Sequence, residues 1–227
     1  MPRTIEKVTA FITRQSKDGH DLLLLAHPNA GVQIPAGTVE DYETPKEAVI
    51  REVTEETGLV PSSISIRQYL GFAEDRLPEG HRIIVESTQV YARPDVTSFD
   101  WAHLRKGIPV VLSGRRAGGF SQVTYEEFDR VPNPQYVTMC ITGWVPDDVL
   151  TDMKKRHFFH LEFHGHSEER WTVDADNHRF TLFWAPLADL PEIIQPQDRW
   201  LAFLYRQVHP IHSGESDTKN DTNAQTP

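Results

Sequence analysis

The stretch GTVEDYETPKEAVIREVTEETGL, residues 37–59, contains the clearest helix signal in the chain. Thr44 can act as the N-cap, a proline follows it, and Glu47 completes a T-x-x-E capping box. Gly58 can end the helix in the left-handed conformation. The stretch therefore predicts a helix of about 13 residues over 45–57, close to the usual length in globular proteins.

This helix has two distinct faces. At about 100° per residue, the side chains of Glu52, Glu55 and Glu56 fall on one narrow face. Val49 and Val53 fall on an adjoining apolar stripe. One side of the helix can therefore pack on a sheet while its neighbouring edge points carboxylates into a cleft.

The same stretch is strongly acidic. Residues 37–58 hold seven acidic and two basic residues. Their net charge of −5 is half of the chain's formal net charge of −10. Three carboxylates within one helical turn repel one another. A hard divalent cation held by oxygen ligands, Mg²⁺ or Mn²⁺, compensates for such repulsion and in turn binds phosphate oxygens. A solvated acidic face is the alternative interpretation of the three glutamates taken alone.

The surrounding residues favour the metal site. The stretch reads Gly37, Glu43, Arg51-Glu52-Val53, Glu55-Glu56 and Gly58-Leu59 at fixed spacing. This pattern resembles the box of the Nudix hydrolases at every defined position. The preceding IPAG, residues 34–37, is similar to the loop of relatives that act on ADP-ribose and sugar nucleotides. The late FTLFWAPLADLP and DRWLAFLYR are similar to the usual end of the family's domain.

The resemblance implies a Nudix-type α/β/α sandwich and hydrolysis of the pyrophosphate bond in a nucleoside diphosphate linked to another moiety. It assigns Mg²⁺ or Mn²⁺ to Glu52, Glu55, Glu56 and the carbonyl of Ala36. Gly37 would allow close approach of the chain, and Gly37 and Arg51 are the expected substrate-binding residues. Arg51, Glu52 and Glu55 are expected to take part in catalysis.

Arg51 would orient a box carboxylate or pair with Glu43; a surface pair with Glu55 at i,i+4 is equally consistent with the sequence. The family also uses a catalytic glutamate outside the box, at no fixed spacing. Glu168 and Glu169 are favoured because they precede a late strand in a loop. Glu126 and Glu127 are the other candidates, and an ordinary solvated loop is the simpler interpretation of each glutamate.

The remaining chain predicts a mixed β-sheet flanked by helices, an α+β fold in one domain over residues 1–212. Expected strands cover 5–13, 21–27, 64–74, 82–92, 108–113, 120–125, 136–142, 157–164 and 178–185, and a last helix covers 196–208. Residues 94–155 exceed a minimal domain of this family. We expect this insertion to form extra strands in a homodimer interface or a pocket wall, since its apolar runs need burial. Residues 213–227 are expected to be a disordered tail.

Composition narrows the function classes. The chain lacks an apolar run long enough to span a bilayer and lacks a signal peptide at its start, so no membrane partner is expected. A single cysteine, Cys140, fits a reducing cytoplasm and excludes a Cys-rich zinc site. The acidic balance argues against nucleic acid as a partner. A small nucleotide-diphosphate substrate is the expected partner.

Other interpretations stay open at this point. A nucleotide-binding sensor without catalysis shares the family's fold, as does an isomerase of isoprenoid diphosphates, and sanitation of nucleoside triphosphates is a third alternative. His160, Glu162 and His164 share one face of a predicted strand, which fits a transition-metal site or, more simply, a polar strand face. Four aromatic residues could stack on a base or belong to the core: Phe72, Phe159, Trp171 and Trp184.

Overall fold

The computed structural model describes residues 3–17, 19–175 and 178–208; the predicted tail at 213–227 lies outside them. The predicted first helix is confirmed as α1, Pro45–Thr57. Thr44 and Glu47 form the expected capping box, and Gly58 ends the helix with a φ of 70°. No helix in the described part of the chain is both long and apolar enough to span a bilayer.

The larger sheet has the strand order β14-β15-β2-β1-β13-β5, with β3 pairing with β2 and β4 with β1. Its strands are β1 Thr4–Ser16, β2 Gly19–His27, β3 Gly31–Gln33, β4 Ala36–Thr38, β5 Ile64–Arg76, β13 Met153–Phe163, β14 Arg170–Ala175 and β15 His178–Pro186. The sheet is mixed, because β1 and β13 are parallel while its other pairs are antiparallel.

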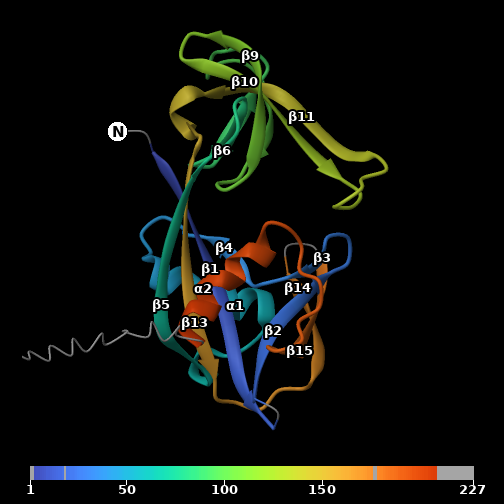
Figure 1. Ribbon diagram of the computed structural model, residues 1–227. Coiled ribbons are helices and arrows are strands. Elements are labelled where there is room, and N and C mark those ends of the chain that lie inside the picture. The colour runs from blue at the N-terminus through green and yellow to red at the C-terminus, as the bar shows by residue number, and fades with distance from the viewer. Residues whose placement is uncertain (1–2, 18, 176–177, 209–227) are drawn as a thin grey trace, which may run out of the picture.

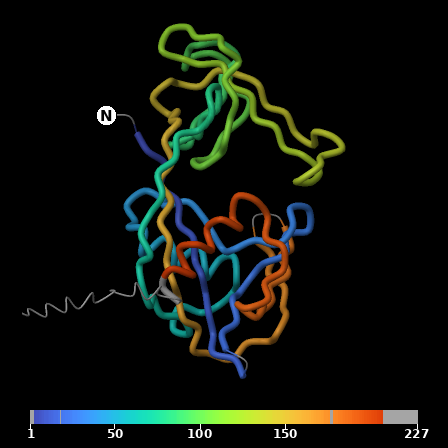
Figure 2. The backbone as a smooth tube through the Cα atoms, in the orientation of Figure 1, coloured from blue at the N-terminus to red at the C-terminus, as the bar shows by residue number. Residues whose placement is uncertain are grey.

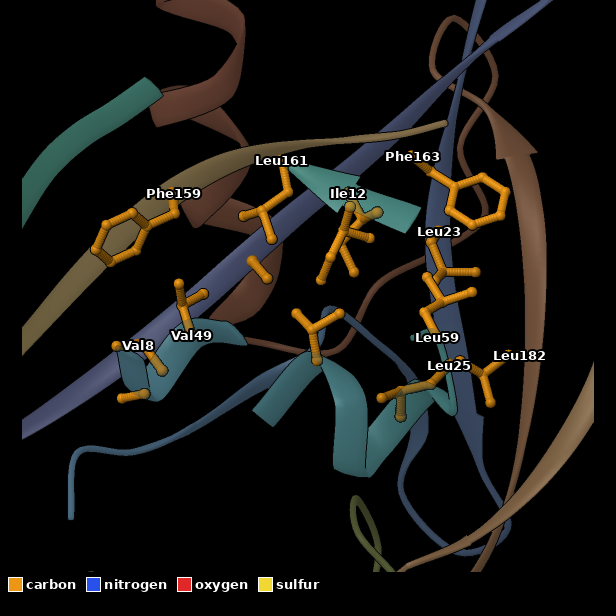
Figure 3. Packing of buried hydrophobic residues seen from close by; sticks show 14 of the residues in the cluster. Val8, Ile12, Leu23, Leu25, Val49, Leu59, Phe159, Leu161, Phe163 and Leu182 are labelled. Atoms are coloured by element: carbon orange, nitrogen blue, oxygen red, sulfur yellow. The ribbon is translucent and has the colours of Figure 1, made fainter. Parts of the chain in front are cut away.

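A helix covers each face of this sheet (Figure 1). Alternate residues of β1 point to opposite faces, so Val8 and Ile12 pack with Val49 and Val53 of α1, part of the cluster drawn in Figure 3. Phe11, on the opposite face, packs with residues of α2, Gln197–Val208. The predicted α/β/α sandwich is therefore confirmed.

The α2 side of the core depends on Phe158, which is 1% exposed and stacks on Phe203 with ring centroids 3.9 Å apart. We expect Phe158→Ala to lower the free energy of unfolding by about 3–5 kcal/mol, because it leaves a cavity among large apolar side chains. Urea unfolding measures this loss. Phe72→Ala is the matched control, since Phe72 is 49% exposed; a similar loss in both variants would contradict the assignment of this core.

The insertion forms a second sheet of order β12-β6-β9-β10-β11-β7-β8. Its strands are β6 His81–Ile84, β7 Thr88–Tyr91, β8 Asp100–Leu104, β9 Pro109–Ala117, β10 Phe120–Phe128, β11 Val137–Pro146 and β12 Leu150–Thr151. The sheet has its own core, which includes Ile84, Val123 and Val145. The single-domain prediction therefore missed a second hydrophobic core.

The boundaries of the second sheet also differ from those predicted. It spans residues 81–151 rather than 94–155, and the strand expected at 82–92 is divided into β6 and β7. The chain bends at residues 86–87, where Glu86 pairs with Arg3 and the Ser87 hydroxyl accepts a hydrogen bond from the Lys106 amide. These partners are distant in sequence, so no local pattern marks the break.

The two long strands β5 and β13 connect the second sheet to the sandwich and run side by side (Figures 1 and 2). Several further contacts join the parts, two of them between the loops that face each other. Lys106 Nζ lies 2.7 Å from a carboxylate oxygen of Asp41, and the Val131 amide donates to the Asn29 carbonyl at 2.8 Å. Val137 and Met139, on β11 of the second sheet, are exposed in the single chain. The homodimer interface expected from this sheet stays a prediction.

Candidate active site

The carboxylates of Glu52 and Glu56 on α1 bind the short strand β4. The Ala36 amide donates to Glu56 Oε2 at 2.9 Å, and the Thr38 amide donates to Glu52 Oε1 at 3.0 Å. Pairing of Gly37 with Val8 on β1 holds β4 beside the helix. The box helix and the loop before it therefore meet through two of the carboxylates that the sequence singled out.

Position 37 must be a glycine because the Glu52 carboxylate lies directly against the backbone there. A Cβ atom at position 37 would lie 1.8 Å from Glu52 Cδ and 2.0 Å from Glu52 Oε1. Any side chain there would displace either the carboxylate or the strand. The predicted close approach at Gly37 is thus present, and the group that approaches is the carboxylate of Glu52.

The direction of the β4 backbone follows from the same hydrogen bonds. In an extended strand the amide and carbonyl of one residue point to the same side. Thr38 illustrates this, since its amide donates to Glu52 and its carbonyl accepts from Arg51 Nη2 at 2.9 Å. The Ala36 amide also points to α1, so the Ala36 carbonyl faces the box carboxylates.

Arg51 links the acidic side chains of the box. Its guanidinium donates to Glu43 at 2.7 and 3.1 Å, and its Nη1 lies 3.0 Å from both Glu52 Oε1 and Glu55 Oε2. Arg51 therefore contacts Glu43, the box carboxylate Glu52 and Glu55 at the same time, which are the three kinds of partner that the sequence left open. The hydrogen bond from Arg51 lowers the pKa of Glu43, whereas burial raises the pKa of Glu52 despite the same neighbour.

These side chains do not form a ready metal cage. Among the described residues, no three His, Cys, Asp or Glu side chains are arranged closely enough to hold a metal ion. The Glu55 side chain is 58% exposed and is turned to Arg51. Because each carboxylate has a protein partner in this arrangement, metal binding would require at least one of them to exchange it. The donor set itself, carboxylates beside a backbone carbonyl, fits a hard cation.

The second sheet contributes to a pocket beside the box. A pocket of about 280 Å³ is lined by Glu40 and Tyr42 from the box loop, by Val85 just after β6, and by Lys106 from the insertion. Lys106 is the residue of the insertion that lines this pocket, and a pocket wall built by the insertion stays a prediction. A larger pocket, of about 990 Å³, lies elsewhere and is lined by residues that include Arg14, His166 and Glu169.

Glu168 and Glu169 precede a strand, β14, as predicted, but the structure does not bring them to the box. Glu169 pairs with Arg14 of β1, which lies six residues beyond Val8, the partner of Gly37. At about 3.3 Å per residue, about 20 Å of strand separates the two points. The local sequence predicted the loop correctly, but only the pairing of β1 determines at which end of the sheet it lies.

Glu126 and Glu127 lie on β10 of the second sheet, opposite Cys140 and Met139 of β11. They are therefore not part of the sandwich that carries the box. A catalytic role for either residue stays a prediction.

Two cations that were not predicted lie beside the box, Lys7 of β1 and Arg156 of β13. Lys7 Nζ donates to Thr38 Oγ1 at 2.6 Å, and Arg156 Nη1 donates to the Val8 carbonyl at 3.0 Å. The one available signal was the basic run KKR at 154–156, at the start of a strand whose apolar residues follow it. Its proximity to the box arises from the parallel pairing of β13 with β1.

The predicted His160, Glu162 and His164 face does not gather into a metal site. His160 bonds to Thr13, Glu162 pairs with Arg67, and His164 bonds to Ser65. The polar-face interpretation fits these contacts. Likewise Phe159 and Trp184 are core residues, Trp171 packs against that core, and Phe72 is 49% exposed.

Comparison with known proteins supports the assignment of the box. The family model described as NUDIX domain matches residues 5–100. Over 71 residues the chain is 37% identical to the 8-oxo-dGTP diphosphatase of Escherichia coli, covering 31% of this chain and 47% of that protein. Over 54 residues it is 46% identical to the ADP-ribose pyrophosphatase of Methanocaldococcus jannaschii, covering 23% and 30%. The match thus spans less than half the length of either relative.

Two solved structures resemble the whole chain more loosely. The NUDIX domain of Shewanella oneidensis NrtR, complexed with ADP ribose, has a TM-score of 0.45 at 11% identity and covers 92% of this chain and 91% of that one. A C. elegans Ap4A hydrolase has a TM-score of 0.44 at 13% identity and covers 90% and 98%.

The family match covers the strand that holds β4, the box helix and the loop between them, which are the elements that build the site. The box pattern lies within the matched residues. Residues 5–100 of this chain therefore match a NUDIX domain, and the sandwich built around them agrees with that match.

Proposed function

We propose that this protein is a divalent-metal-dependent pyrophosphohydrolase that cleaves a nucleoside diphosphate linked to another moiety. The observation that carries the proposal is the approach of Glu52 and Glu56 to β4 at Gly37, where a side chain would not fit. The two carboxylates accept amide hydrogens of this short strand. They also lie together where a bound divalent cation would link them to the phosphate groups of a substrate.

The residues proposed to hold Mg²⁺ or Mn²⁺ are Glu52, Glu55, Glu56 and the carbonyl of Ala36. Nudix proteins generally use divalent cations, and the bound cation supplies polarisation of phosphate oxygens and activation of water. The raised pKa of Glu52 supports this assignment, because a buried carboxylate beside Glu55 gains from a nearby positive charge.

The remaining box residues are proposed to position this set. Arg51 holds Glu43, Glu52 and Glu55 through one guanidinium, so it fixes the carboxylates relative to β4. Glu43 in turn accepts the amide hydrogen of Glu40 at 2.6 Å and ties the loop before α1 to the same network. Contact of Arg51 and Gly37 with substrate is part of the proposal.

ADP-ribose or a related sugar nucleotide is the favoured substrate class. The IPAG loop and the 46% identity to an ADP-ribose pyrophosphatase support it. The 37% identity to an 8-oxo-dGTP diphosphatase supports the alternative, an oxidised nucleoside triphosphate. The cytoplasmic location predicted from composition stays a prediction.

A substrate screen tests the proposal. ADP-ribose, sugar nucleotides, dinucleoside polyphosphates and 8-oxo-dGTP are incubated with the protein in Mg²⁺ and then in Mn²⁺, and products are separated by ion-exchange chromatography. We expect turnover of at least one sugar nucleotide, with loss of activity in excess EDTA and recovery on adding metal. Binding of ADP-ribose without turnover in either metal would favour the sensor alternative.

A further inference from the structure

Two basic residues lie on the opposite side of β4 from the box helix. Strand β1 lies between β4 and β13, so that Lys7 is level with Thr38 on one side and with Arg156 on the other. Lys7 shares a strand face with Phe11, and Arg156 shares one with Phe158. Both aromatic residues belong to the cluster that α2 covers, so both basic side chains start from that face.

Lys7 makes no ion pair of its own within the described chain. Its Nζ donates to Thr38 Oγ1 at 2.6 Å, and none of the described carboxylates lies within ion-pair distance of it. Burial, together with the charge of Arg156, lowers the pKa of Lys7 to about 8. The fold thus removes this ammonium group partly from water without a direct counter-charge among the described residues.

Arg156 is held rigidly and also makes no ion pair with a described carboxylate. Its Nη1 donates to the Val8 carbonyl and to Thr9 Oγ1 at 2.9 Å. Its guanidinium stacks on Trp200, 4.1 Å from the ring centroid. Its Nε atom is buried and has no hydrogen-bond partner among the residues that the structure describes. Burial lowers the pKa of Arg156 to about 10.

Two neighbouring cations that are partly buried and lack such pairs are unfavourable for folding, because the removal of each charge from water is only partly compensated. Glu52 attracts Lys7 electrostatically, and Glu56 attracts Arg156, but only at distances longer than an ion pair. The planar guanidinium and the compact ammonium are the two side chains best suited to bind phosphate. A bound anion would supply the missing counter-charge.

We infer that Lys7 and Arg156 bind the phosphate groups of the substrate on the side of β4 that faces away from the box helix. The inference rests on the proposed function. It places the box carboxylates on one side of the strand and the two cations on the other. Neither residue belongs to the box, and 148 positions of sequence separate Val8 from the Arg156 that binds its carbonyl.

The insertion packs against one side of the pair formed by Lys7 and Arg156. Gly107, in the turn between β8 and β9, packs so closely that a Cβ there would lie 2.7 Å from Thr38 Oγ1 and 3.0 Å from Lys7 Nζ. The neighbouring Lys106 pairs with Asp41 and holds the turn in place. The second sheet therefore shields Lys7 on that side.

Binding of inorganic pyrophosphate to the full chain in saturating Mg²⁺, measured by isothermal titration calorimetry, tests the inference. We expect Lys7→Met and Arg156→Gln each to weaken pyrophosphate binding on the order of 10- to 100-fold, as loss of one charged hydrogen-bond donor does. Arg156→Lys keeps the charge without the planar fork and should recover part of the affinity. Lys155→Met is the matched control, because Lys155 neighbours Arg156 on β13 but pairs with Glu74.

The affinity for Mn²⁺ alone separates a binding defect from a folding defect. It should be unchanged or tighter in Lys7→Met and Arg156→Gln, because a repelling charge is removed, whereas misfolding would weaken it. Wild-type pyrophosphate affinity in both variants, or no pyrophosphate binding by the wild-type protein, would overturn the inference. If the wild-type protein hydrolyses no nucleotide but still binds pyrophosphate through these residues, the proposed activity fails and the phosphate site stands.

Discussion

Glu52→Gln and Glu56→Gln are each expected to lower kcat on the order of 10²- to 10⁴-fold on a substrate identified by the screen. Each change removes one negative charge from the proposed ligand set at nearly constant shape. In Glu56→Gln the new amide oxygen can still accept the Ala36 amide hydrogen that Glu56 accepts at 2.9 Å, so the loop should keep its position. Steady-state kinetics at saturating metal measure the effect.

The free energy of unfolding of these two variants should rise or stay level. Burial raises the pKa of Glu52, which means that the ionised form is disfavoured in the fold, and the neutral amide avoids this cost. Glu47→Gln is the control on the same helix, because Glu47 belongs to the capping box and not to the site. It should leave turnover intact and cost at most about 1 kcal/mol. Equal turnover by the wild type and Glu56→Gln would defeat the proposed mechanism.

Gly37→Ala is expected to lower kcat on the order of 10²-fold or more. The added Cβ would lie 1.8 Å from Glu52 Cδ, so either the carboxylate or β4 must shift, and a displacement of about 1 Å at a catalytic group has an effect of this size. Overpacking should also lower the free energy of unfolding by about 1–3 kcal/mol. Kinetics and urea unfolding measure the two effects separately.

Gly80→Ala is the matched control for this change. Gly80 has a φ of 79°, but a Cβ there meets no atom within 4 Å, so the substitution adds backbone strain without a clash at the box. It should lower stability by about 1–2 kcal/mol and leave kcat unchanged. If Gly37→Ala kept the wild-type kcat, the close approach of Glu52 to β4 would have no catalytic role.

The sequence predicted the elements whose signals are local. The box helix was identified to the residue because Thr44, Glu47 and Gly58 are a cap, a capping box and a terminator within one short segment. The expected strand at 120–125 lies within β10, and the one at 157–164 lies within β13 except for its last residue, since the residue pattern of a strand is a property of the strand itself. The shared face of Glu52 and Glu56 also follows from helix periodicity alone.

The short strands and the boundaries of the second sheet could not be predicted in the same way. Strand β4 has three residues, Ala36–Thr38, and its pairing with β1 and its two hydrogen bonds to the box helix define it. The break near Glu86 depends on Arg3 and Lys106. In each case the partner that determines the structure is remote in the chain.

Local sequence is sufficient for the box, because it specifies which helix forms, which carboxylates share its face, and which family the pattern belongs to. Which other groups reach the site depends on tertiary contacts. Parallel pairing of β1 with β13 brings Arg156 beside Lys7, and the direction of β1 carries Arg14 and Glu169 to the far end of the sheet. The physical reason is that helix faces repeat every few residues, whereas strand register is set by contacts between segments far apart in sequence.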